Sequence, residues 1–193
     1  MSTLSQYAGI LFGDRVKVLG KTLRPYCIGH ALLLHLLDSP YVSKGKRGDG
    51  DLLAAIYVCS RPWQEAAVGL KRKRTKWMLK LWDWQTGRFK TGYEMDVASL
   101  VFQGYLNNAW TGPQSWEDME VNETANGNSA GAPAVLVLKV ALCSFLGASH
   151  EEALSTPIRQ ALHEMPTWLE VNGANNLMSD GDVADIENLL ARQ

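Results

Sequence analysis

The residues with the clearest chemical potential are Cys27 and His30, three positions apart where a predicted helix begins. A helix N-terminus favours a thiolate and a neighbouring imidazole can accept its proton, so the pair could act as nucleophile and base. The sequence shows neither an oxyanion donor nor a group that would orient the imidazole. Because a cysteine at the start of a buried helix usually serves packing, we interpret Cys27 as a core residue.

No set of residues has the spacing of metal ligands. His30 and His35 are five apart, so on one helix they point about 140° from each other. His163-Glu164 lacks the second histidine of the HExxH motif. The three cysteines are scattered among apolar residues, as in a chain with reduced, buried thiols. We expect no metal and no cofactor.

The glycines around residue 48 do not form a phosphate-binding loop. Residues 45–50 depart from the GxxxxGK[ST] pattern, and no predicted strand precedes them. Asp49 and Asp51 are better explained as caps of the following helix. Since no acid, base, nucleophile or metal ligand stands out, we predict a protein that is not an enzyme.

The strongest binding signal is a basic run followed by tryptophans. Five of the six residues at 71–76 are Lys or Arg, and large apolar residues then alternate with Lys80 and Asp83. Such a segment can bind nucleic acid, pack its tryptophans in the core beneath a solvated basic face, or contact an acidic surface. The candidate binding residues are Lys71, Arg72, Lys73, Arg74, Lys76 and Trp77 in this run, with Lys44, Lys46 and Arg47 in a second basic segment.

Charge is distributed unevenly along the chain. Residues 1–90 carry a net charge of +10 and residues 91–193 carry −11, which leaves −1 for the whole chain. This asymmetry suits three arrangements: binding of an acidic partner, head-to-tail association of copies, or attraction between the two halves of one chain. We expect self-association.

Length and composition indicate one soluble domain. A chain of 193 residues with 46% apolar content can build a substantial core. No signal peptide is recognisable, and the longest apolar run, 132–146, is too short to span a bilayer. We predict a single helical domain over 1–193 in the cytoplasm, with no membrane contact. It divides into a basic half at 1–110, a flexible polar loop at 111–131 and an acidic helical half at 132–193.

Two apolar helices, 28–37 and 51–60, should form a helical hairpin at the centre of the domain. Leucine stands on almost every side of the first, which predicts burial nearly all round, and Pro40 closes it. Alternating polar and apolar residues at 15–23 predict a short β-hairpin against these helices. The fold class is therefore mainly α, with six to eight helices. Further helices are expected at 63–70, 77–84, 94–110, 134–146, from 149, at 157–164 with a kink or new start at Pro166, and from 179.

Three strings within residues 23–62 also carry a resemblance: LRPYCIGH, DSP and GDLL…VCSRP. They resemble small proteins encoded in the structural modules of tailed bacteriophages and prophages, similar to tail assembly chaperones. The acidic C-terminal helices show a looser likeness. The resemblance implies a helical protein that works by binding, coating the tape-measure protein until the tail tube polymerises around it. Such chaperones act in the host cytoplasm and are usually absent from the finished particle.

The first functional hypothesis is thus a phage tail-morphogenesis protein, a chaperone that binds the tape-measure protein or another tail protein. The second is a nucleic-acid-binding accessory protein that uses the basic run at 71–76. A third is a minor structural component of the virion.

Overall fold

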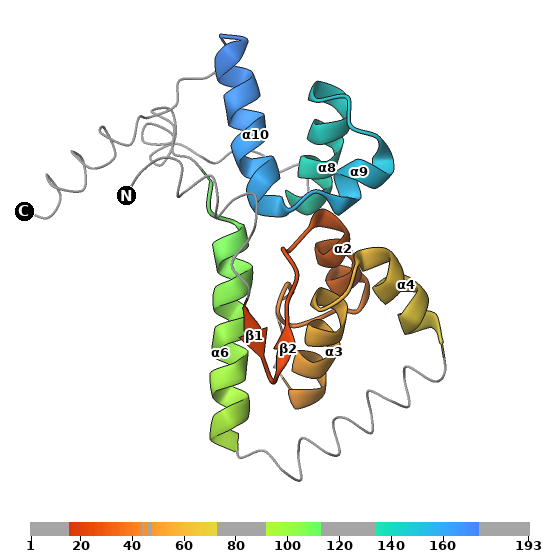
Figure 1. Ribbon diagram of the computed structural model, residues 1–193, viewed down its shortest axis with the longest axis vertical. Helices are drawn as coiled ribbons and strands as arrows, with labels where there is room; N and C mark the ends of the chain where they lie inside the picture. The colour runs from red at the N-terminus through yellow and green to blue at the C-terminus, as the bar shows by residue number, and fades with distance from the viewer. Residues whose placement is uncertain (1–15, 44, 46–47, 73–91, 113–133, 174–193) are drawn as a thin grey trace, which may run out of the picture.

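The computed structural model describes residues 16–43, 45, 48–72, 92–112 and 134–173. Within these ranges the chain forms seven helices and a two-stranded antiparallel hairpin (Figure 1), which confirms the predicted fold class. The elements are β1 (Lys17–Val18), β2 (Lys21–Thr22), α2 (Ile28–Leu36), α3 (Asp49–Cys59), α4 (Trp63–Lys71), α6 (Gly92–Ala109), α8 (Ala134–Phe145), α9 (His150–Ser155) and α10 (Ile158–Val171).

The hairpin turns tightly at Leu19 and Gly20. Both residues have positive φ, 46° and 75°, which is the backbone of a type I′ turn. Val18 is buried, and β1 contacts α6, so the ribbon lies against that helix beside α3 (Figure 1). The predicted hairpin is confirmed, with α6 as the main element beneath it.

The helices α2 and α3 contact each other at the centre of the fold, as predicted. Seven of the eleven residues of α3 are buried, and α2 also contacts α4, α8 and α9. The prediction of burial all round is wrong at the end of α2, because Leu36 is 81% exposed and Leu37 is 42% exposed. The helix ends before Pro40, and Asp38 in the left-handed region turns the chain.

Residues 24–28 connect most of these elements through their backbone. The Arg24 N–H donates to the Cys59 carbonyl at the end of α3, and the Arg24 carbonyl accepts from the Tyr105 hydroxyl of α6. Two more bonds join this segment to the start of α10: Ile28 N–H to the Thr156 carbonyl at 3.2 Å, and Ile158 N–H to the Tyr26 carbonyl at 2.9 Å. This short extended segment therefore ties α3, α6 and α10 to the start of α2.

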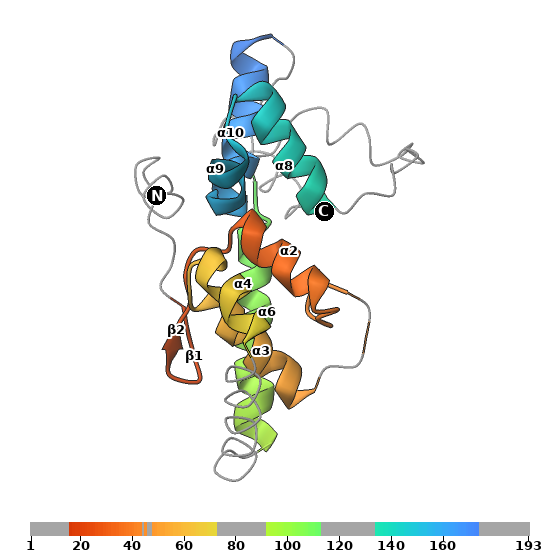
Figure 2. The same ribbon diagram turned by 90° about the vertical axis from the view of Figure 1, so that its right-hand side faces the viewer.

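The helices α8, α9 and α10 form a second group that packs on α2 (Figure 2). Contact between α6 and α10 adds another link, so the basic and acidic halves touch at several places. Ser149 and Glu152 form a reciprocal cap at the start of α9, with the Ser149 N–H donating to Oε2 at 2.9 Å. A single domain over 1–193 remains a prediction.

Helix α10 runs from Ile158 to Val171 without interruption, although Pro166 lies inside it. A new helix starting at Pro166 is therefore excluded. Pro157 is the N-cap of α10, and the Thr156 hydroxyl donates to the Glu152 carbonyl at the end of α9.

Three predicted segments lie wholly or mostly outside the described residues: the helix at 77–84, the loop at 111–131 and the helix from 179. Among the helices that the structure does describe, none has the length and apolarity needed to cross a membrane.

Candidate functional site

Two of the predicted binding residues fall within the described ranges. Lys71 is the last residue of α4 and Arg72 follows it as the C-cap, both exposed. The other predicted residues lie outside these ranges, and their roles stay predictions. They are Lys73, Arg74, Lys76, Trp77, Lys44, Lys46 and Arg47.

The structure brings Arg61 to the same region, a residue that the sequence analysis did not select. Arg61 and Arg72 both line a hollow of about 450 Å³ between the end of α3 and the outer side of α4. The Arg61 guanidinium lies 4.0 Å from the centre of the Tyr57 ring and donates to the Tyr57 carbonyl at 3.1 Å. These contacts hold the charge in place at the mouth of the hollow.

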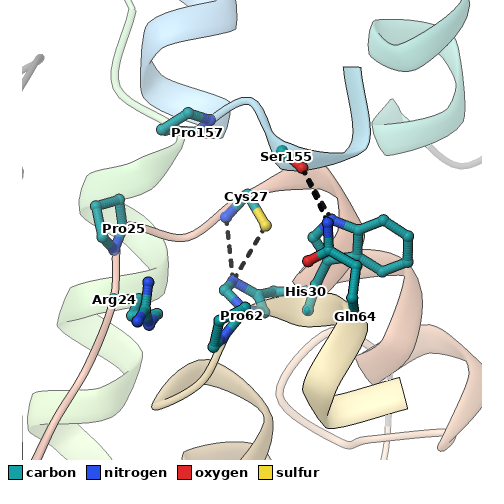
Figure 3. A pocket seen from close by; sticks show the side chains of 9 residues that line it. Arg24, Pro25, Cys27, His30, Pro62, Gln64, Ser155 and Pro157 are labelled. Carbon is teal, nitrogen blue, oxygen red and sulfur yellow. Dashed lines mark hydrogen bonds between the residues drawn. The ribbon is translucent and has the colours of Figure 1, made fainter. Parts of the chain in front are cut away.

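The Cys27–His30 pair is the closest approach to a catalytic arrangement among the described residues. Cys27 Sγ lies 3.2 Å from His30 Nδ1 (Figure 3). On the other side of the ring, His30 Nε2 lies 2.7 Å from the Arg61 carbonyl oxygen. Because a carbonyl only accepts, Nε2 carries the ring proton and Nδ1 is the acceptor for the thiol and the Cys27 N–H. The Arg61 carbonyl is thus the orienting group that the sequence did not reveal.

Burial keeps both members of this pair neutral. It raises the pKa of the Cys27 thiol, and the backbone N–H groups of His30 and Gly29 offset this only in part. Burial also lowers the pKa of His30, and the charge of Arg24 lowers it further. A neutral thiol that is only 5% exposed is a poor nucleophile, so the pair acts as a cap at the start of α2.

A small hollow of about 210 Å³ lies over this pair, between α2, α4 and the end of α9 (Figure 3). Two of the lining residues are joined by a hydrogen bond, in which the Trp63 indole N–H donates to Ser155 Oγ at 3.1 Å. Gln64 donates to the same oxygen at 3.5 Å and to Glu151 at 3.3 Å. Trp63, Gln64 and Ser155 on the rim of the hollow are therefore bonded to one another.

No group of three or more His, Cys, Asp or Glu side chains in the described part of the chain is arranged to hold a metal ion. Cys27, Cys59 and Cys143 are separate free thiols in the structure, and the first two are buried.

The outer face of α6 carries an open apolar surface. Tyr93, Val97, Leu100 and Gly104 follow one another at intervals of four, three and four residues, and all four are exposed. Tyr93 is 77% exposed and Leu100 is 69% exposed. A side-chain carbon added at Gly104 would have no neighbour within 4 Å. We call these four residues, together with Val101 beside Leu100, which is also exposed, the α6 stripe.

A second set of residues on α6 faces the core at the same intervals. Met95, Ala98, Phe102 and Tyr105 are buried, and Phe102 packs against Tyr41 with ring centres 5.0 Å apart. The α6 stripe also borders a hollow of about 290 Å³ formed with the β-hairpin at Val18. Helix α6 therefore carries two apolar faces, of which its own fold buries one.

Comparison of this chain with protein-family models, with curated proteins and with solved structures finds no match.

Proposed function

We propose that this protein is a binding protein of phage tail morphogenesis, a chaperone for the tape-measure protein, and that it holds its client on the α6 stripe. The observation that carries the proposal is the exposure of Tyr93, Val97, Leu100 and Gly104 at coiled-coil spacing along one helix. Apolar residues at intervals of three and four form the seam on which a second helix packs.

The stripe suits a helical client for two physical reasons. Burial of apolar surface stabilises a complex by about 25 cal/mol per Å², and Leu100 and Tyr93 offer much of their surface. Gly104 has no side chain, so the backbone of a partner helix can approach closely at that end. A helix with apolar residues at the same intervals would complete the seam.

The resemblance of residues 23–62 to tail assembly chaperones supports the identity of the client. The resemblance implies a long helical client that is kept soluble until the tail tube polymerises around it. Binding of this kind needs no catalytic group, in keeping with the buried, neutral state of Cys27 and His30. We therefore propose a non-enzymatic role in the host cytoplasm.

Co-expression with the tape-measure protein of the same phage or prophage tests this proposal. The wild-type chain should raise the soluble fraction of the tape-measure protein, and the double variant Leu100→Gln/Val101→Gln should lose this effect. Leu36→Gln/Val171→Gln removes two apolar side chains elsewhere that are even more exposed, at 81% each, and should keep it.

Equal solubility of the client with and without the chain would overturn the chaperone proposal. If both double variants raised the soluble fraction of the client equally, the binding surface would lie away from the outer face of α6. Detection of the chain in purified virions would favour a structural component over a chaperone.

A further inference from the structure

The hollow beside α4 carries a fixed positive charge. This charge lies outside the α6 stripe, which is the surface proposed for the client. Arg61 is held by Tyr57, as described above, and Arg72 lies on the same rim. Among the residues that the structure describes, neither guanidinium forms an ion pair with a carboxylate. Lys71 is adjacent and exposed, so three positive charges gather at this corner. We call Arg61, Lys71 and Arg72 the basic corner.

The surroundings of the basic corner favour a protein surface over nucleic acid as its partner. Glu65 and the 54%-exposed Val68 lie on the same rim, and a phosphate backbone would meet both the carboxylate and an apolar side chain. The Tyr57 ring is covered by Arg61 and offers no open face for base stacking. An acidic protein surface with carboxylates among apolar residues fits this mixture.

The acidic half of the chain is a source of such carboxylates, since residues 91–193 have a net charge of −11 against +10 for residues 1–90. Glu164 and Glu170 are exposed on α10, in the acidic half. Figures 1 and 2 both place α10 toward one end of the long axis, apart from α4. One copy can therefore offer its basic corner while α10 of the next copy offers its carboxylates.

We propose that the protein self-associates head to tail, with the basic corner of one copy against the exposed carboxylates Glu164 and Glu170 on α10 of a second copy. The two surfaces differ, so the contact is heterologous and can repeat from copy to copy. The association needs no client, and it is independent of the function proposed for the α6 stripe. Each contact rests on exposed charges, so it should be weak and sensitive to salt.

Sedimentation velocity of the nuclease-treated full chain over a range of concentrations tests this proposal. At about 0.05 M NaCl we expect species larger than the monomer, and at about 0.5 M NaCl, where screening is stronger, mostly monomer. Arg72→Gln and Glu164→Gln/Glu170→Gln should each weaken association about threefold to tenfold. Arg72 is chosen because its side chain has no contact that the fold needs among the described residues.

Lys17→Gln/Lys21→Gln is the control, because it removes positive charge from the hairpin and should leave association unchanged. A mixture of Arg61→Glu/Arg72→Glu with Glu164→Lys/Glu170→Lys should form hetero-oligomers, although each variant alone is monomeric. A monomer at every concentration in low salt would overturn the proposal. Association that both sets of variants leave intact would also overturn it. So would association that is seen only in samples without nuclease treatment.

Discussion

Residues 24–30 and the outer face of α6 differ in how many of their side-chain and backbone groups have partners within the fold. Around Cys27 and His30, the thiol, both ring nitrogens and most backbone groups have partners within the fold. The α6 stripe is made of ordinary apolar residues, yet it leaves most of its surface to solvent. The side chains of Cys27 and His30 are thus bonded within the fold, whereas the α6 stripe is left to solvent.

This difference follows from two free-energy costs: that of burying a polar group without a partner, and that of leaving an apolar side chain exposed. Leaving a buried polar group unpaired costs about 1–3 kcal/mol, a cost that the fold bears at the Tyr26 hydroxyl, which has no partner among the described residues. Cys27 and His30 avoid that cost by bonding to each other and to the Arg61 carbonyl. An exposed apolar side chain costs the fold little, and its burial remains available to a partner. We can test the contrast by changing each region and measuring stability.

Of the changes at residues 24–30 and on the α6 stripe, the largest effect should come from Gly29→Ala in α2. A Cβ at this position would lie 2.5 Å from Trp63 Cγ and under 3 Å from two more atoms of the ring. The ring cannot rotate away easily, since its N–H is bonded to Ser155. After a gain in helix propensity of up to about 1 kcal/mol, we expect a net loss of about 2–3 kcal/mol in unfolding free energy, measured by urea denaturation.

Gly104→Ala is the matched control on the α6 stripe. The same added carbon meets nothing within 4 Å there, so the variant should be as stable as the wild type or more stable by up to about 1 kcal/mol. Equal losses at Gly29 and Gly104 would contradict the difference between the two regions.

An intermediate effect is expected at His30, where stability should depend on pH. Burial lowers the pKa of His30 below its ordinary value of 6.5, so the unfolded chain binds a proton before the folded chain does. The contribution of the neutral ring to stability is complete above that value and is lost as the pH falls below it. We expect the midpoint of urea denaturation to fall between pH 7 and pH 5, with 6.5 inside this window.

His30→Leu should remove most of this pH dependence and cost about 1–3 kcal/mol at pH 8, since the Arg61 carbonyl and the Cys27 N–H lose a partner. His163 also has a lowered pKa, caused by partial burial and by Arg159, and its contribution has the same sign. His163→Gln therefore serves as the control. If His163→Gln abolished the pH dependence of the urea midpoint and His30→Leu preserved it, His30 would not be the buried neutral ring described here.

The sequence predicted the elements far better than it predicted which of their faces are free. Helical spacing, Pro62 before α4 and Gly20 in the hairpin are local signals, and those elements formed close to their expected bounds. The central position of α2 and α3 followed from their density of apolar residues. These predictions needed no knowledge of which elements become neighbours.

The candidate site depended on contacts between distant residues. Arg61 orients His30 across 31 positions and meets Arg72 on the rim of a hollow, and neither relation has a signature in sequence spacing. On α6, apolar residues stand at helical intervals on two faces, and the sequence does not show which of them the hairpin and α10 leave open. Leu36 was expected in the core for the same reason.

The smallest effect on stability should come from the α6 stripe itself. Leu100→Gln/Val101→Gln changes two exposed side chains, so the unfolding free energy should stay within about 0.5 kcal/mol of wild type while client binding is lost. Phe102→Ala, the next residue on the same helix, removes a fully buried ring and should cost about 3–5 kcal/mol. Urea denaturation of the two variants compares the unfolding free energies of an exposed and a buried position within one turn of the same helix. A loss above about 1 kcal/mol for the double variant would show that the chain buries this face itself, because surface positions without partners do not cost that much. The α6 stripe would then be part of the core, and the client would have to bind elsewhere.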